Sequence, residues 1–269
     1  MLAFPNAKIN IGLRVINRRM DGFHSLETIL FPINIKDIIE VVEADKLTFS
    51  SSGIPIPGNH MDNLCLKAYH IIHNDRNIPP VHIHLHKHIP IGAGLGGGSS
   101  DAAFLIRLLD QKFTLDLSLD KMEFYAKQLG ADCAFFIHNH PVLATERGDQ
   151  FHPITLVLKA YYLVLVMPPI HVSTPEAYKN VRMSIPNESL EALISLPIEE
   201  WRNHIGNSFE ESVFKKHPTI ANIKSSLYEV GALYASMSGS GSSVYGIFKS
   251  EIQLPELERH YQVFYNVGL

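Results

Sequence analysis

The stretch IPIGAGLGGGSSDAA, residues 89–103, has five glycines between Gly92 and Gly98 and leads into helix-forming sequence. Glycine loses more conformational freedom on folding than any other residue, so such a cluster needs a physical cause. Main-chain N–H groups that are not covered by side chains and lead into a helix N-terminus can bind an anion, because the helix dipole adds to their partial charges. We therefore predict that this stretch binds phosphate. The competing interpretation is a tight turn that close packing requires.

Three better-known glycine loops do not fit this stretch. The spacing Gly92-x-Gly94-x-x-Gly97 matches the dinucleotide-binding fingerprint, but that fold needs a buried parallel strand before the loop and an acidic residue about 20 residues later at the end of another strand. Here the preceding strand alternates with histidines, and the region near Asp116 is expected to be a loop. A Walker A loop would end in Gly-Lys-Ser/Thr, and the catalytic-loop and DFG signatures of protein kinases do not occur.

Strand and helix patterns flank the glycine stretch. VHIHLHKHI, residues 81–89, alternates apolar and polar residues, which predicts a half-exposed strand of an antiparallel or mixed sheet. SSDAAFLIRLLDQ, residues 99–111, has helical spacing with serine and aspartate in its first turn. A second helix is expected from Ser118 to Leu129, where Gly130 ends it.

The remaining sequence predicts further strands and helices without repeats or a flexible linker. Strands are expected within residues 6–16, 35–44 and 151–168, and two more within 232–250, joined by a second glycine-serine turn. Helices are expected from Asn63 to Asn74, from the proline of TPEAYKNV at 174–181, and over most of residues 187–230. The pattern restarts near residues 150–160, so we expect two closely packed lobes.

The composition restricts the class of protein. The chain has 269 residues, 46% of them hydrophobic, and a net charge of −4, which gives no reason to expect nucleic acid or an anionic membrane as a partner. Cys65 and Cys133 lie outside any CxxC pattern, so neither a disulfide framework nor a thiolate metal site is indicated. No apolar run approaches the roughly 18 residues of a membrane span, and no signal or transit peptide is expected. A cytoplasmic location is the expectation.

Four other features each allow a functional and a plain structural interpretation. Lys8 and Asn10 share one face of a strand, which by itself favours a solvated face. Asp132 follows a helix end and precedes the apolar run CAFFI, so it is either a cap or a base whose environment its neighbours control. The alternating histidines of residues 82–88 favour an exposed face over a metal site. Phe23 and His24 follow a turn-forming Asp-Gly pair. They are either a core aromatic beside a surface histidine or part of a binding site, and the sequence favours neither interpretation.

Taken together, six stretches resemble the GHMP kinases, small-molecule kinases with a loop of the type P-x-x-x-G-L-G-x-S-S-x-A-A. The match runs in order along nearly the whole chain: PNAKINIGL (5–13), RMDGFHSLETI (19–29), IPIGAGLGGGSSDAA (89–103), LGADCAFFI (129–137), VSTPEAY (172–178) and SMSGSGSSV (236–244). The resemblance implies a two-lobed α+β fold with a ribosomal-protein-S5-domain-2-like N-terminal lobe and a ferredoxin-like C-terminal lobe. We accordingly expect domains at residues 1–152 and 153–269.

The resemblance also implies roles for individual residues. Lys8 and Asp132 match the catalytic pair of the family: Asp132 is expected to take the proton of the attacking hydroxyl, while Lys8 keeps Asp132 ionised and offsets charge on the transferred phosphoryl group. Mg²⁺ is expected on the β- and γ-phosphates, with Ser99 and Ser100 as alternative contacts and its ligands otherwise unassigned. Asn63, Lys87 and Asp101 map to the adenine side. ATP phosphates are expected on the loop residues Pro90, Ile91, Gly92, Ala93, Gly94, Leu95, Gly96, Gly97, Gly98, Ser99 and Ser100.

The extra glycine of GLGGGSS and the DGFH sequence are typical of one branch of the family, which phosphorylates the 2-hydroxyl of a cytidine diphosphate-linked methylerythritol in the non-mevalonate route to isoprenoid precursors. That branch implies stacking of cytosine between two aromatic rings, while a fixed polar group reads its edge. Phe23 stands where the family usually has tyrosine, so any hydrogen bond from that hydroxyl is lost. The implied substrate contacts are Asn10, Phe23, His24, Thr174, Tyr178, Gly239, Ser240 and Gly241.

Two alternatives stay open at this stage. One is another GHMP kinase, acting on homoserine, mevalonate or a sugar, against which the DGFH sequence and the aromatic residues argue. The other is a nucleotide-binding protein without turnover, which would have no need of a positioned base such as Asp132. The oligomeric state, monomer or homodimer, is also open.

Overall fold

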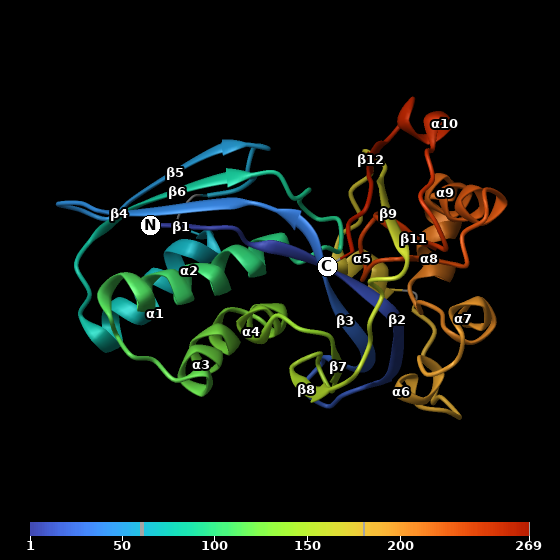
Figure 1. Ribbon diagram of the computed structural model, residues 1–269. Helices are drawn as coiled ribbons and strands as arrows, with labels where there is room; N and C mark the ends of the chain where they lie inside the picture. The colour runs from blue at the N-terminus through green and yellow to red at the C-terminus, as the bar shows by residue number, and fades with distance from the viewer. Residues whose placement is uncertain (60–61, 180, 269) are drawn as a thin grey trace. The chain divides into compact units, whose positions relative to one another are not determined.

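The computed structural model describes residues 1–59, 62–179 and 181–268 and contains both helices and sheets (Figure 1). It divides into two compact units that alternate along the sequence. The first unit contains residues 1–7, 35–91 and 96–140, and the second contains residues 8–34, 92–95 and the described residues from 141 onward. The expected division between residues 152 and 153 is a division along the chain. These interleaved units do not test it, and it stays a prediction.

The first unit is built on a four-stranded mixed sheet. Its strand order is β1 (Leu2–Ala3), β4 (Ile38–Glu43), β6 (Val81–Lys87) and β5 (Thr48–Gly53). β6 runs antiparallel to β4 and parallel to β5, which confirms the mixed-sheet strand predicted from the alternation at 81–89. The apolar residues of β6 are buried and its histidines lie on the opposite face.

Four helices complete the first unit and lie on one side of this sheet (Figure 1). They are α1 (Leu64–Arg76), α2 (Gly97–Phe113), α3 (Leu119–Leu129) and α4 (Ala131–His138). α2 contacts β1 and β4, and it also packs against α1, α3 and α4. Ser118 caps α3 and Gly130 ends it, as predicted, whereas α2 begins at Gly97, two residues before the predicted start. α4 had not been predicted, because its eight residues are too short and too uniformly apolar to show helical periodicity.

The second unit contains two four-stranded sheets and six helices (Figure 1). One sheet has the order β2 (Asn6–Arg18), β3 (His24–Lys36), β7 (Val142–Thr145), β8 (Gln150–Pro153). The other has the order β10 (Tyr234–Met237), β11 (Val244–Phe248), β9 (Tyr162–Met167), β12 (Gln262–Phe264). The helices are α5 (Thr174–Lys179), α6 (Leu190–Leu193), α7 (Ile198–His204), α8 (Glu210–Lys216), α9 (Pro218–Glu229) and α10 (Pro255–Glu258).

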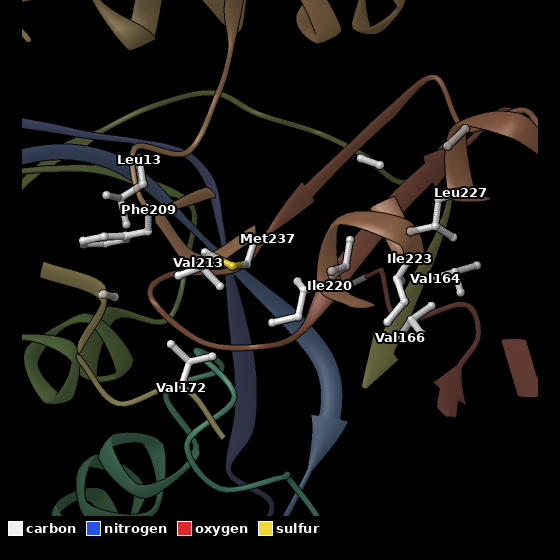
Figure 2. Close-up of a cluster of buried hydrophobic side chains, with 14 of the residues drawn as sticks. Leu13, Val164, Val166, Val172, Phe209, Val213, Ile220, Ile223, Leu227 and Met237 are labelled. Carbon is white, nitrogen blue, oxygen red and sulfur yellow. The ribbon is translucent and has the colours of Figure 1, made fainter. Parts of the chain in front are cut away.

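The core of the second unit lies between α9 and the β9–β11 sheet, as Figure 2 shows. Ile220, Ile223 and Leu227 recur at helical spacing and are fully buried on the inner face of α9. They belong to the same cluster as Val164 and Val166 of β9. This packing holds the antiparallel β10–β11 hairpin, which confirms the two strands and the glycine-serine turn predicted for residues 232–250.

One part of the strand prediction is wrong. Residues 154–159, within the apolar stretch expected to give strands at 151–168, are irregular and lie between β8 and β9. Only Leu158 of this run is buried, and Val157 is 71% exposed. The helix expected to begin at Pro175 begins at Thr174, and Asn180 of the same motif lies outside the described residues.

Among the described residues, no helix combines the length and the apolar character that crossing a membrane would require.

Candidate functional site

In the glycine loop between β6 and α2, three of the five glycines have main-chain conformations that favour glycine. Gly92, Gly94 and Gly96 have φ angles of +72°, +79° and +70°. Residues with a Cβ rarely adopt this left-handed region, so glycine is required at each of these alternate positions. Gly96 is also the N-cap residue of α2 and provides no side chain to cap the helix.

In the second unit, close packing gives Gly94 a further reason to be glycine. A Cβ on Gly94 would come within 2.0 Å of the carbonyl oxygen of Ser238, and a Cβ on Gly241 within 2.1 Å of the amide nitrogen of Gly94. The two glycine-serine segments therefore pack main chain against main chain. The Ser238 hydroxyl donates to the Gly94 carbonyl at 3.0 Å, and the Ser243 hydroxyl donates to that of Ala93 at 2.6 Å.

The last two glycines of the loop lie in the first turn of α2, in the first unit, and differ from each other. A Cβ on Gly97 would come within 2.9 Å of Ile89 Cγ2 and 3.0 Å of Lys87 Nζ. A Cβ on Gly98 would meet no atom within 4 Å, and the φ angle of Gly98 is not left-handed. Neither conformation nor packing explains glycine at position 98. Its absence of a side chain leaves the helix N-terminus open to a ligand.

Lys87 lies beneath this helix start, between two carboxylates. Its ammonium donates to Asp101 of α2 at 2.7 Å and, over a short contact, to Asp37. All three side chains are at most 3% exposed. The ammonium of Lys87 is therefore directed at carboxylates, and the predicted roles of Lys87 and Asp101 on the adenine side stay predictions. Asn63, the third residue assigned there, caps α1 by accepting the N–H of Cys65 at 2.8 Å.

The charges of this buried group shift its titration. Burial raises the pKa of Asp101 to about 8; the positive charge of Lys87 opposes this rise and the negative charge of Asp37 adds to it. Burial lowers the pKa of Lys87, but the two carboxylates outweigh that effect and the pKa is raised. One cation thus balances one carboxylate, while Asp101 keeps its proton near neutral pH. Oδ1 of Asp101 is buried and has no hydrogen-bond partner among the described residues.

The two serines that open α2 are placed differently. A hydrogen bond with Ser99 lowers the pKa of the Cys133 thiol, although burial, the larger effect, raises that pKa to about 12. The hydroxyl of Ser100 is buried and has no hydrogen-bond partner within the described part of the chain. Ser100 is fully buried, whereas Ser99 is half-buried. Cys65 and Cys133 are both free and buried.

Lys8 and Asn10 lie on one face of β2, in the second unit, and the expectation of a solvated face is wrong. Both side chains are 4% exposed. Lys8 Nζ donates to Asn10 Oδ1 at 2.5 Å, Asn10 Nδ2 donates to Thr28 at 3.0 Å, and the Thr28 hydroxyl donates to the carbonyl of Gly12 at 2.6 Å. The main chain around Asn10 is held as well, because its N–H donates to Ser238 and its carbonyl accepts from Tyr245. A buried ammonium fixed in this way suits an anionic ligand better than water.

Asp132 lies in the first turn of α4, in the first unit, and is half-buried. The N-cap residue of α4 is Gly130, so Asp132 is not the cap that the plain structural interpretation expected.

The aromatic residues of the second unit include one stacked pair, and the stacking of cytosine between two aromatic rings stays a prediction. His24 stacks on Tyr178 with ring centroids 4.7 Å apart and an interplanar angle of 26°. This separation leaves no room for a base between these two rings. The edge of Phe209 packs against Tyr178 at 4.8 Å, while Phe23 is 58% exposed and faces the guanidinium of Arg147 at 5.3 Å. Phe23 is therefore not the core aromatic of the plain structural interpretation. The rings of His24 and Tyr178 stack directly on each other.

The second glycine-serine segment, at residues 236–244, meets the start of α5. The hydroxyls of Thr174 and Ser240 form a hydrogen bond at 3.2 Å, so the structure brings together two of the predicted substrate contacts. Gly239 has a φ of +58° and its carbonyl accepts a hydrogen bond from Asn207 at 2.8 Å. The same amide group of Asn207 donates to Met237 at 2.9 Å, which fixes the turn on both sides of Ser238.

The alternating histidines form a ladder on the open face of the first sheet, which confirms the exposed-face interpretation. Hydrogen bonds of 2.7 to 3.0 Å alternate between imidazole and hydroxyl groups along β6 and β5. The members, in order, are Thr48, His82, Ser50, His84, Ser52 and His86. The part of the chain that the structure describes contains no group of three or more histidine, cysteine, aspartate or glutamate side chains arranged to hold a metal.

Sequence reasoning missed four residues that support these segments: Asp37, Thr28, Asn207 and Ser238. Each is at least 94% buried and bonds to a residue far away in sequence. Ser238 belongs to a motif that the sequence displays. The other three carry no local signal.

Comparison with known protein families matches both parts of the chain to one family. The model of the GHMP kinases N terminal domain matches residues 63–140, and that of the GHMP kinases C terminal matches residues 189–266.

Relatives and a solved structure give a closer comparison. The chain is 51% identical, over 95% of its length and 94% of the relative, to a 4-diphosphocytidyl-2-C-methyl-D-erythritol kinase of Parabacteroides distasonis. It is 50% identical to the protein of the same name from Bacteroides thetaiotaomicron, with 98% of both chains covered. A crystal structure of a 4-(cytidine 5'-diphospho)-2C-methyl-D-erythritol kinase superposes with a TM-score of 0.83 at 29% identity, covering 98% of both chains.

Exchange of Gly94 or Gly98 for alanine is expected to change the stability of the protein differently, because only Gly94 is closely packed. Gly94→Ala places a Cβ against the carbonyl of Ser238 and forces a left-handed residue to carry a side chain, so it should lower the free energy of unfolding by at least about 2 kcal/mol. Gly98→Ala meets no neighbour in a helix and should leave stability unchanged or raise it by up to about 1 kcal/mol. Urea unfolding of both variants measures this, and equal losses would contradict it.

The raised pKa of Asp101 predicts a pH dependence of stability. Between about pH 4 and the folded pKa of about 8, the folded protein holds a proton that the unfolded chain has released, so the free energy of unfolding should fall as pH rises. Asp101→Asn removes this titration and should lose less stability than wild type between pH 5 and pH 8 in urea unfolding. Asp45→Asn, at an exposed aspartate, is the control and should follow wild type. A wild-type curve parallel to that of Asp101→Asn would contradict the assignment.

Proposed function

This chain belongs to the 4-diphosphocytidyl-2-C-methyl-D-erythritol kinases of the GHMP kinase family, and on that basis we propose how its residues transfer the γ-phosphoryl group of ATP to the 2-hydroxyl of 4-diphosphocytidyl-2-C-methyl-D-erythritol. The reaction is a step of the non-mevalonate route to isoprenoid precursors. Relatives at 50% identity or more over nearly the whole chain support this substrate over homoserine, mevalonate or a sugar. The wholly non-catalytic alternative is not retained.

One observation carries the assignment of the phosphates: Gly98 is glycine for no internal reason, at a helix start that has no side-chain cap. In our proposal the main-chain N–H groups at the start of α2 donate hydrogen bonds to phosphate oxygens, which approach where a Cβ would otherwise stand. The helix dipole adds to this attraction. The residues from Pro90 to Ser100 form the binding segment.

The chemical step needs a base and a positive charge, and we assign them to Asp132 and Lys8. Asp132 accepts the proton of the 2-hydroxyl as the oxygen bonds to the γ-phosphorus and the bond to the bridging oxygen of ADP breaks. Lys8 offsets negative charge on the transferred group. The buried contact of Lys8 with Asn10 supports this role, because it holds the ammonium in one position before substrate binds.

The residues also fit a magnesium ion bound with the nucleotide. The unpartnered hydroxyl of Ser100 offers an oxygen of the kind that Mg²⁺ accepts, whereas Ser99 is engaged with Cys133. We propose Ser100 as the contact of the protein with the ion. When bound, Mg²⁺ would neutralise charge on the β- and γ-phosphates.

We place the cytidine end of the substrate on the second unit, at Phe23, His24 and Tyr178. Because the rings of His24 and Tyr178 already stack, cytosine would stack on the exposed ring of Phe23 rather than between those two. Thr174 and Ser240, with the neighbouring glycines of their turn, would hold the diphosphate. Asn10 would act here through Lys8. A cytoplasmic location, where ATP is supplied, is part of the same proposal.

An assay with purified protein tests the function. Protein, ATP, Mg²⁺ and 4-diphosphocytidyl-2-C-methyl-D-erythritol should yield ADP and a product heavier by one phosphoryl group, as seen by mass spectrometry. Asp132→Asn and Lys8→Ala should lower kcat by about 10²- to 10⁴-fold with unchanged circular dichroism. Asp120→Asn, an aspartate in the first turn of α3, is the matched control and should keep wild-type kcat. Product from homoserine or mevalonate instead, or near-normal turnover of folded Asp132→Asn, would contradict the proposal.

A second prediction concerns Gly98 alone. A Cβ at this position should obstruct the phosphates, so Gly98→Ala should raise the KM for ATP by about 10-fold or more while the KM for the cytidine substrate stays within about twofold. Steady-state kinetics with each substrate varied in turn measures the two constants. An unchanged KM for ATP would place the phosphates elsewhere.

A further inference from the structure

Asp37 is a fully buried carboxylate that the proposed reaction does not use. It lies in the single-residue connection between β3 and β4, and its exposed fraction is 0%. Its own N–H donates to the carbonyl of Pro5 at 2.8 Å, which fixes its main chain. Nothing in the sequence distinguishes it from a turn aspartate on the surface.

Both oxygens of Asp37 are engaged by the residues that precede the glycine loop. Oδ1 accepts the N–H of His88 at 2.6 Å and that of Ile89 at 2.7 Å. These two amides follow the last residue of β6, where no neighbouring strand continues to accept them. Oδ2 accepts the ammonium of Lys87. One carboxylate therefore fixes three consecutive residues at the point where the loop leaves the sheet.

The same contacts reach the residues that follow the loop. Lys87 bonds to Asp101 in the second turn of α2 at 2.7 Å, and its ammonium lies 3.0 Å from the position that a Cβ on Gly97 would take. Within the first unit, the strand that enters the loop and the helix that leaves it are thus joined through Asp37, Lys87 and Asp101. A purely apolar core would not need such a group, and buried ion networks are often no more stable than apolar replacements.

We propose that Asp37 is a positioning residue for ATP: by holding the amides of His88 and Ile89 and the ammonium of Lys87, it fixes the entry of the phosphate-binding loop. This inference rests on the proposed function of that loop. Asp37 touches no nucleotide itself. It acts on affinity for the phosphate tail because a loop with an unfixed entry must be ordered at the cost of binding free energy.

Two variants separate the contacts of Asp37. Asp37→Ala removes every acceptor and should raise both the KM for ATP and the Kd for a non-hydrolysable ATP analogue by about 10- to 100-fold, the range expected for losing charge-assisted hydrogen bonds. Asp37→Asn keeps an oxygen for the two amides and loses only the pairing with Lys87, so its increase should be smaller. The KM for the cytidine substrate should stay within about threefold in both, since the described contacts of Asp37 include none of the residues assigned to that substrate.

A merely structural role would give a different result. Ile72→Ala, at a fully buried residue of α1 in the same unit, is the control for lost stability. It should lower the melting temperature and leave the KM for ATP unchanged. If Asp37→Asn and Asp37→Ala behave like this control, with a lower melting temperature and an unchanged KM for ATP, the proposal is overturned.

The remaining outcomes are also decisive. If Asp37→Ala does not fold, Asp37→Asn carries the test, and an unchanged Kd for the analogue in that folded variant would overturn the role of the Lys87 contact and with it the proposal. A wild-type protein that binds no analogue and transfers no phosphoryl group would overturn the proposed function itself. An active wild type with insensitive Asp37 variants would overturn only the positioning role.

Discussion

The packing of main chain against main chain in the second unit is the constraint on which the conformation of the glycine loop depends. At Gly94 and Gly241 the two glycine-serine segments approach so closely that a Cβ on either glycine would overlap main-chain atoms of the other segment. Side chains cannot supply a core at such a contact. The short hydroxyls of Ser238 and Ser243 therefore replace one, because they reach neighbouring carbonyls without adding volume. This explains why the segment at residues 236–244 combines glycine with serine rather than with apolar residues.

The fold was predictable from sequence wherever its signal is local. Period-two alternation identified β6, capping residues identified the limits of α3, and turn residues identified the β10–β11 hairpin. The prediction failed where an apolar run lacked a periodic signal: α4 was missed, and residues 154–159 were expected to extend a strand but are irregular. Apolar character alone does not distinguish a short buried helix, a strand and a connection.

The site was predictable to the level of motifs but not to that of their partners. Alternation placed Lys8 and Asn10 on one face of β2 correctly, yet local reasoning made that face solvated. The partners that bury it, among them Thr28 and Tyr245, lie 18 and 235 residues from Asn10. Local pattern likewise did not predict that the ring of His24 stacks on that of Tyr178. Spacing along one strand cannot reveal which distant groups satisfy its polar atoms.

The buried charges of the first unit follow from a sequence of physical requirements. Two consecutive amides leave the end of β6 and need an acceptor, since a buried N–H without one costs about as much as a lost hydrogen bond. A carboxylate can accept both at once, but its charge then needs a cation in the same dry environment. Lys87 supplies that cation, and its remaining hydrogen-bonding capacity brings in Asp101 from α2. The two amides at the end of β6 need a hydrogen-bond acceptor, and the side chains that meet this need also connect the start of α2 to the strand.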